Sequence, residues 1–120
     1  MLDNSNTDWQ TLKLRPATRE YLTIISQTSH EDFVKAIVLF GSEARGEATL
    51  TSDVDLALIS TRSLTHAERR SILKDISFEL DCKVDCRIVC LREEALNTGK
   101  KLHVGTSIKQ DGVIIYENVS

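Results

Sequence analysis

The chain has 120 residues, a formal net charge of −3, 41% hydrophobic residues and 28% charged residues. This length and composition fit one globular domain with a core of its own and exclude a disordered or fibrous chain. The acidic balance disfavours direct binding to nucleic acid, which requires a basic surface, and no apolar run is long enough to cross a membrane. Three cysteines and the lack of a signal peptide favour a reducing, cytoplasmic location.

Apolar periodicity and turn signals predict an α/β (α+β) chain. Residues 1–10 are polar and are expected to form a disordered N-terminal segment, which leaves residues 11–120 for the domain. Pro16 suits the first turn of a helix, and Thr65 with Glu68 matches a capping box. The predicted elements are helices at 16–29 and 65–80, strands at 36–40, 53–60, 83–90 and 113–116, and short helices at 93–98 and 103–110.

The clearest functional signal lies between the first two predicted strands. Gly41-Ser42 ends the first strand, and after ten residues Asp53-Val54-Asp55 opens the second. Because strand residues alternate between faces, both aspartates point the same way and Val54 points into the core. Two such carboxylates repel each other unless a divalent cation lies between them, and magnesium prefers few carboxylates plus phosphate oxygens and water. Gly41 lets phosphate approach the backbone, and Ser42 supplies a hydroxyl and an amide donor.

The order of the elements predicts that Asp85 joins this pair. The helix between the second and third strands makes a crossover, so these strands should be parallel and start at the same end of the sheet. For Gly41 to reach that end, the first strand must be antiparallel to the second. The predicted sheet is therefore small and mixed, with about four strands flanked by helices. Its three carboxylates could hold two metal ions that activate a hydroxyl and stabilise a leaving pyrophosphate.

Other residues with functional chemistry allow more than one interpretation. Arg45 either contacts phosphate or makes a surface ion pair. Arg87 shares a strand face with Asp85, and we favour a pair with the carboxylates over a substrate contact. Cys86 and Cys90 fall in a predicted strand and are interpreted, like Cys82, as small packing residues rather than metal ligands.

The motif resembles the nucleotidyltransferase superfamily that includes DNA polymerase beta, and within it the minimal nucleotidyltransferases, or MNT proteins. The family signature of Gly-Ser, ten residues and Asp-x-Asp is matched at Gly41, Ser42, Asp53 and Asp55. Asp85 takes the place of the third family carboxylate. The resemblance implies a single nucleotidyltransferase domain.

The resemblance also implies a role for each site residue. The Gly41-Ser42 turn and Arg45 would bind the triphosphate of ATP, and the three aspartates would hold two Mg²⁺ ions. Asp85 would also assist deprotonation of the acceptor hydroxyl. Glu43 departs from the family, whose members often carry a basic, aromatic or small residue here, and an acidic side chain beside a triphosphate is unfavourable unless it points outward. A pair between Glu43 and Arg45 would compete with the phosphate role of Arg45.

Many MNT proteins pair with a HEPN-domain ribonuclease toxin. The resemblance implies an antitoxin that transfers AMP from Mg-ATP onto a tyrosine of that toxin. The short chain leaves no room for a second substrate domain, so the acceptor is expected to bring its own binding surface. Two alternatives stay open: a binding module that neutralises a toxin by occlusion, and a small-molecule nucleotidyltransferase that acts as a homodimer.

Overall fold

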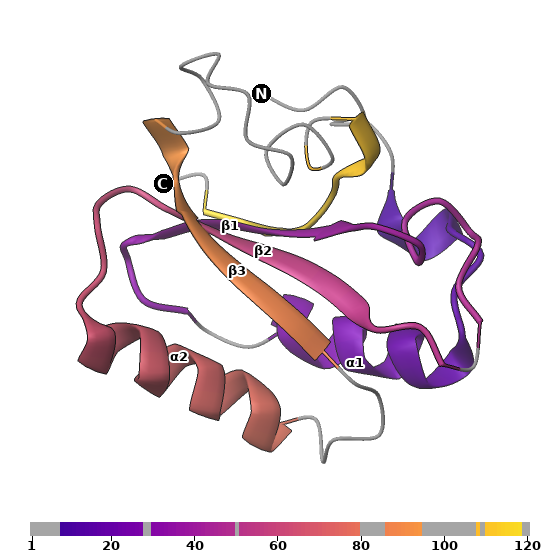
Figure 1. Ribbon diagram of the computed structural model, residues 1–120, viewed down its shortest axis with the longest axis horizontal. Coiled ribbons are helices and arrows are strands. Elements are labelled where there is room, and N and C mark those ends of the chain that lie inside the picture. The colour runs from indigo at the N-terminus through magenta and orange to yellow at the C-terminus, as the bar shows by residue number, and fades with distance from the viewer. Residues whose placement is uncertain are drawn as a thin grey trace.

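The chain folds into helices and strands in the order that the sequence predicts. The computed structural model describes residues 8–27, 30–49, 51–79, 86–94, 108 and 110–118. A short 3-10 helix, η1 (Trp9–Thr11), is followed by α1 (Pro16–Gln27), β1 (Val34–Phe40), β2 (Val54–Ser60), α2 (His66–Glu79), β3 (Cys86–Arg92) and β4 (Val113–Glu117) (Figure 1). These elements confirm the predicted α+β class.

The strands form one mixed sheet with the order β3-β2-β1-β4. β1 is antiparallel to β2 and to β4, whereas β2 is parallel to β3. The crossover between the parallel strands contains α2, as such a connection requires. The predicted topology is therefore confirmed, and β2 and β3 both start at the end of the sheet where β1 finishes.

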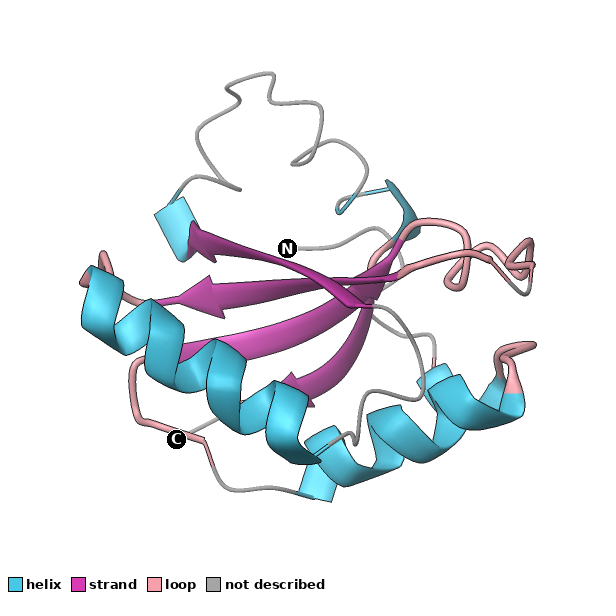
Figure 2. Cartoon of the chain, turned by 60° about the horizontal axis from the view of Figure 1, so that its bottom comes forward, coloured by secondary structure: helices cyan, strands magenta, loops and turns pink. Residues whose placement is uncertain are grey.

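Both helices cover the same face of the sheet (Figures 1 and 2). The core on this face contains Leu22 and Ile25 from α1 and Ile72 from α2, which pack with residues of β1, β2 and β4. Val54, at the start of β2, belongs to this core and is fully buried, as predicted. Burial of one large apolar side chain contributes about 1.5–3 kcal/mol, so this layer fixes the position of the strand that follows Asp53.

The opposite face of the sheet carries a second apolar cluster, to which β2 contributes Ala57 and Ile59. Alternation along β2 puts Asp55 on the same face as these two residues. Ile108 packs on this face as well. The carboxylates of the motif therefore lie on the face that α1 and α2 do not cover.

Local signals set the starts of both long helices. Pro16 is the first residue of α1. Before α2, the Glu68 amide donates to Thr65 Oγ1 at 3.1 Å, and the Thr65 amide donates to Glu68 Oε1 at 3.0 Å. This reciprocal pair is the predicted capping box, and it satisfies two amides that the helix leaves without partners.

The expectation that residues 1–10 are disordered needs a correction at residues 8–10. Asp8 caps η1 by accepting from the Gln10 amide, and Trp9 is only 7% exposed in the core. Burial of a large aromatic side chain offsets the entropy cost of ordering the short segment that carries it. Residues 1–7, Cys82, Asp85 and most of the short helices predicted at 93–98 and 103–110 lie outside the described residues.

Candidate functional site

The end of β1 brings Gly41 against Asp55. Phe40 is paired with Asp55 in the β1–β2 register, so the turn after β1 begins beside the carboxylate. Gly41 has a φ of +77°, and a Cβ at this position would lie 2.3 Å from Asp55 Oδ2. Both its backbone conformation and this contact require glycine here. The predicted proximity of the glycine turn and the Asp-x-Asp pair is thus present in the structure.

The turn after Gly41 coils back on itself. The Arg45 amide donates to the Gly41 carbonyl at 3.2 Å, and the Glu47 amide donates to the Ser42 carbonyl at 2.9 Å. Within the described residues, no hydrogen bond uses the amides of Ser42, Glu43 or Ala44. Free amides at the start of such a turn favour an anion, so the loop has the chemistry to receive phosphate oxygens.

Asp55 is the more buried carboxylate of the motif. Its side chain is 19% exposed, against 42% for Asp53, and its Oδ1 atom is buried without a hydrogen-bond partner. Burial raises the pKa of Asp55 above its usual 3.8; Arg87 lowers this pKa, Asp53 raises it and Arg45 lowers it. A buried acceptor without a donor is costly in a native fold unless a ligand supplies the missing partner.

Arg87 approaches both carboxylates from the neighbouring strand. Its Nη2 atom lies 3.5 Å from Asp53 Oδ2, and its Nε atom lies 3.6 Å from Asp55 Oδ1. The register pairs Asp55 with Arg87 across β2 and β3, which explains this placement. The favoured interpretation of Arg87, an ion pair with the carboxylates of the motif, agrees with this geometry.

The oxygens of Asp53 and Asp55 suit a divalent cation. A cation would satisfy the orphaned Asp55 Oδ1 and neutralise two adjacent negative charges. The described residues contain no group of three or more His, Cys, Asp or Glu side chains that could hold a metal ion. Asp85, the predicted third carboxylate, lies outside the described residues, so its part in the site stays a prediction.

Glu43 departs from both expectations that the sequence raised for it. It neither points outward nor pairs with Arg45: its side chain is fully buried, and its Oε1 atom accepts from Arg15 Nε and from Thr18 Oγ1, each at 2.5 Å. Arg15 also donates to the carbonyl of Thr49 at 2.9 Å. The carboxylate therefore ties the glycine turn to Arg15 and to α1, while its other oxygen, Oε2, is buried without a hydrogen-bond partner.

Arg45 makes two ion pairs instead. Its Nη1 atom lies 3.0 Å from Asp111 Oδ2, and its Nε atom lies 3.3 Å from Glu47 Oε2. The hydrogen bonds to these two carboxylates, first Asp111 and then Glu47, raise the pKa of Arg45. In this arrangement Arg45 links the glycine turn to the residue that precedes Gly112 and β4, and its side chain is still 41% exposed.

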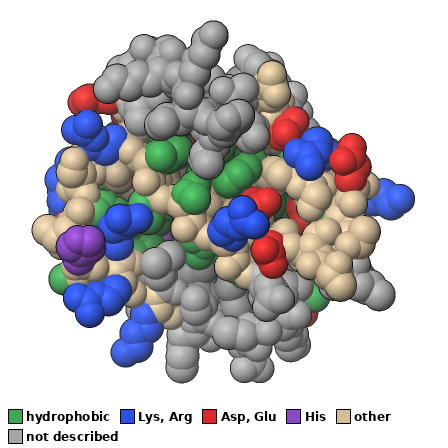
Figure 3. Space-filling view, viewed as in Figure 1, with side chains coloured by type: hydrophobic (Ala, Val, Ile, Leu, Met, Phe, Trp, Pro, Cys, Tyr) green, Lys and Arg blue, Asp and Glu red, His purple; other side chains and the backbone are tan. Residues whose placement is uncertain are grey.

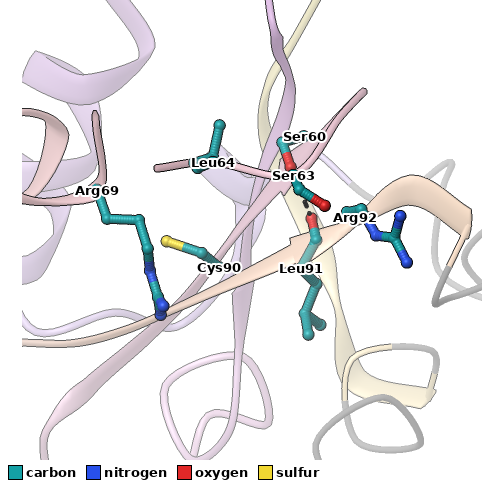
Figure 4. A pocket seen from close by; sticks show the side chains of 7 residues that line it. All are labelled: Ser60, Ser63, Leu64, Arg69, Cys90, Leu91 and Arg92. Carbon is teal, nitrogen blue, oxygen red and sulfur yellow. Dashed lines mark hydrogen bonds between the residues drawn. The ribbon is translucent and has the colours of Figure 1, made fainter. Parts of the chain in front are cut away.

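Charged side chains are distributed unevenly over the surface. In the orientation of Figure 1, acidic side chains lie close to basic ones on the right, where the turn after β1 is found, and basic side chains gather on the left (Figure 3). A pocket at that left end is lined by residues from the ends of β2 and β3 and the start of α2 (Figure 4). Because Ser60 and Arg92 are the last residues of their strands, this pocket is separate from the carboxylate pair.

Comparison with known proteins identifies the class to which this site belongs. A family model described as polymerase beta, nucleotidyltransferase, matches residues 23–119. The chain therefore belongs to this nucleotidyltransferase family, and the match includes the glycine turn and both aspartates of the motif. Among curated proteins, none matches the chain.

Solved structures of similar fold include toxin–antitoxin complexes. A toxin–antitoxin with AMP-PNP has a TM-score of 0.54 and 18% identity, over 86% of this chain and 73% of that chain. A mutant of the MntA–HpeT toxin–antitoxin has a TM-score of 0.52 and 16% identity, over 88% and 75%. A Sulfolobus solfataricus protein assigned as a nucleotidyltransferase has a TM-score of 0.54 and 16% identity, over 85% of each chain. At these identities the likeness concerns the fold.

Proposed function

We propose that this protein transfers AMP from Mg-ATP onto a hydroxyl of a partner protein, a tyrosine of a HEPN ribonuclease toxin, and so acts as its antitoxin. The observation that carries the proposal is the contact between Gly41 and Asp55, in which a phosphate-receptive turn meets a carboxylate with an orphaned buried oxygen. Membership of the nucleotidyltransferase family supports the reaction class.

In the proposed reaction, the turn binds the nucleotide. The free amides of Ser42 and its neighbours hold phosphate oxygens, and the Ser42 hydroxyl adds a donor. Gly41 keeps this turn within reach of Asp55 because any larger residue would push the two apart. Arg45 is held beside the turn by Asp111 and Glu47, from where its guanidinium can reach the outer phosphates.

Asp53 and Asp55 form the metal-binding part of the proposed site, with Asp85 as a third ligand. Bound Mg²⁺ supplies Lewis-acid activation of the acceptor hydroxyl and charge stabilisation of the leaving pyrophosphate. The carboxylates would fix the geometry of the site, and the family resemblance implies that Asp85 also assists deprotonation of the acceptor hydroxyl. Val54 lies in the core between the two aspartates and holds them in place.

A protein acceptor is supported by two observations. The chain is acidic overall, which disfavours a polynucleotide acceptor. Two of the structures with the same fold are toxin–antitoxin complexes, one of them with AMP-PNP, which is an ATP analogue. No helix in the described part of the chain is long and apolar enough to span a membrane.

The test is transfer of label from α-labelled ATP to a HEPN protein encoded beside this chain. With Mg²⁺, the wild-type protein should label the toxin and abolish its ribonuclease activity, whereas Asp53→Asn should do neither. Asp32→Asn is a matched control, because it makes the same change at an exposed residue outside the motif. Absence of label, together with neutralisation by Asp53→Asn, would contradict the enzymatic function.

The alternative is neutralisation by occlusion, without nucleotide transfer. The observation in its favour is Arg87, which already supplies a positive charge to both carboxylates. Under this alternative Asp53→Asn would still bind and inhibit the toxin, and neither toxin nor antitoxin would carry label.

A further inference from the structure

The guanidinium of Arg87 lies next to the oxygen atoms that a metal ion would use. It is 3.5 Å from an oxygen of Asp53 and 3.6 Å from Oδ1 of Asp55, the buried oxygen that lacks a hydrogen bond. A single cation from this chain thus faces both carboxylates of the motif.

The contact is an ion pair that can be broken. Both distances exceed those of a charge-assisted hydrogen bond, and the Arg87 side chain is 68% exposed. Arg87 stands on β3, an edge strand of the sheet, and β2 is its neighbour in the ladder. A long, solvated side chain on an edge strand can rotate away without disturbing the core.

The other arginine near the carboxylates has carboxylate partners of its own. Arg45 lowers the pKa of Asp55 only by its charge, and its own guanidinium is held by Asp111 and Glu47. Within the described residues, Arg87 is the basic side chain in ion-pair contact with Asp53 and Asp55.

We propose that Arg87 is a built-in counter-ion that competes with the divalent metal for Asp53 and Asp55. In the nucleotide-free protein it neutralises part of the charge of the pair and weakens binding of a free cation. For a metal ion to use both carboxylates, Arg87 must leave them. A nucleotide that arrives with its metal brings negative phosphates to which the displaced guanidinium can turn. This inference rests on the proposed function, because it assumes that the carboxylates bind metal.

The experiment measures binding of Mn²⁺ alone, without nucleotide, by electron paramagnetic resonance. Arg87→Gln removes the charge and keeps much of the length of the side chain, and it should tighten Mn²⁺ binding about three- to tenfold, as expected for loss of two exposed ion pairs. Arg92→Gln is the matched control: it lies on the same strand, is also exposed and changes the net charge equally, but it ends β3 at the far end of the sheet. Its Mn²⁺ affinity should equal that of the wild type.

A double variant tests whether the gain in Mn²⁺ affinity depends on the carboxylates. Asp55→Asn combined with Arg87→Gln should lose the gain in affinity. Equal affinities of wild type and Arg87→Gln, an equal gain in Arg92→Gln, or no Mn²⁺ binding by either wild type or Arg87→Gln would overturn the inference. Label transfer to the toxin is a separate measurement, so a protein that transfers AMP but shows no effect of Arg87→Gln on Mn²⁺ affinity would refute this inference alone.

Discussion

Two carboxylates flank the same glycine turn, and their surroundings are opposite. Glu43 follows Gly41-Ser42, is fully buried, and has one oxygen bonded to both Arg15 and Thr18. Asp55 is the second residue of β2, lies beside Gly41, is partly exposed, and has a buried oxygen without a hydrogen bond. Each carboxylate also has a buried oxygen without a hydrogen bond, Glu43 Oε2 and Asp55 Oδ1. The difference lies in the donors: Glu43 accepts two short hydrogen bonds, whereas Asp55 has only a longer ion-pair contact with Arg87, at 3.6 Å.

The difference indicates which carboxylate stabilises the fold and which one is suited to bind a ligand. A buried carboxylate with matched donors holds two segments of chain together, and its removal leaves an unpaired cation behind. A carboxylate that has no hydrogen-bond donor on its buried oxygen and whose pKa is raised by burial costs stability, and groups with such shifted pKa values are concentrated at functional sites. Glu43 therefore builds the loop, and Asp55 is left available for a ligand.

The largest expected effect is that of Asp55→Asn on catalysis. AMP transfer should fall about 1000-fold, because an amide cannot replace the carboxylate charge toward a metal ion. The fold should not suffer: burial raises the Asp55 pKa above 3.8, so its ionised form destabilises the native state as pH rises through this range. The free energy of unfolding at pH 7, measured in urea, should be equal to or above that of the wild type. A large loss of stability would contradict the inference that the buried, ionised Asp55 destabilises the fold.

Glu43→Gln should show the reverse behaviour. The loss of charge leaves Arg15 unpaired in a mostly buried position, so we expect a loss of about 2–4 kcal/mol in the free energy of unfolding. Glu47→Gln is the control, because Glu47 pairs with Arg45 while its side chain is 66% exposed, and its cost should stay below about 0.5 kcal/mol. A similar loss in the free energy of unfolding for the two variants would show that Glu43 stabilises the fold no more than a surface ion pair does.

The two glycines of the turn test how closely the backbone must approach Asp55. Gly41 and Gly46 have positive φ of 77° and 72°, so alanine should cost about 1 kcal/mol at either position from the backbone alone. Only at Gly41 would the new Cβ meet Asp55 Oδ2; at Gly46 the nearest atom is Lys13 Cβ, at 3.8 Å. Urea unfolding should therefore show a larger loss for Gly41→Ala than for Gly46→Ala.

Activity should separate the same two variants. Gly41→Ala displaces the carboxylate and should abolish nucleotide transfer, whereas Gly46→Ala should retain it. Equal activity in the two variants would show that the approach of Gly41 to Asp55 is not needed.

The smallest effect concerns a carboxylate far from the site. The Arg62 side chain and the Thr65 amide lower the pKa of Glu68 from 4.5 to about 2. A lowered pKa stabilises the fold above pH 4.5, and this contribution is lost as pH falls from 4.5 toward 2. Glu68→Gln keeps the capping hydrogen bond but not the charge, so thermal unfolding should show a modest deficit at pH 6 that shrinks toward pH 2. A constant deficit over this range would contradict the charge pair.

Much of the fold follows from local pattern and connection rules. The apolar run before Gly41, the capping box at Thr65 and the crossover after β2 were enough to predict a mixed sheet with Gly41 beside Asp55. These features depend on neighbours in sequence and on chirality, both of which can be inferred from a single chain.

The surroundings of Glu43 could not be predicted in this way. Its partners Arg15 and Thr18 lie 28 and 25 residues earlier in the chain, and no periodicity links them to the turn. The sequence suggested Arg45 as the partner because it is close in the chain, yet the loop coils so that Arg45 faces Asp111. Long-range polar pairs depend on how the elements pack, and packing has no local signature in the sequence.

The most direct test of the account is calorimetric titration of the protein with ATP in the presence and absence of Mg²⁺. We predict binding that depends on Mg²⁺ and is lost in Asp53→Asn and Asp55→Asn, while Asp32→Asn, the same change at an exposed residue outside the motif, binds like the wild type. Absence of binding at millimolar nucleotide, or binding that is independent of both Mg²⁺ and the two aspartates, would contradict the assignment of this turn and carboxylate pair as a nucleotide site.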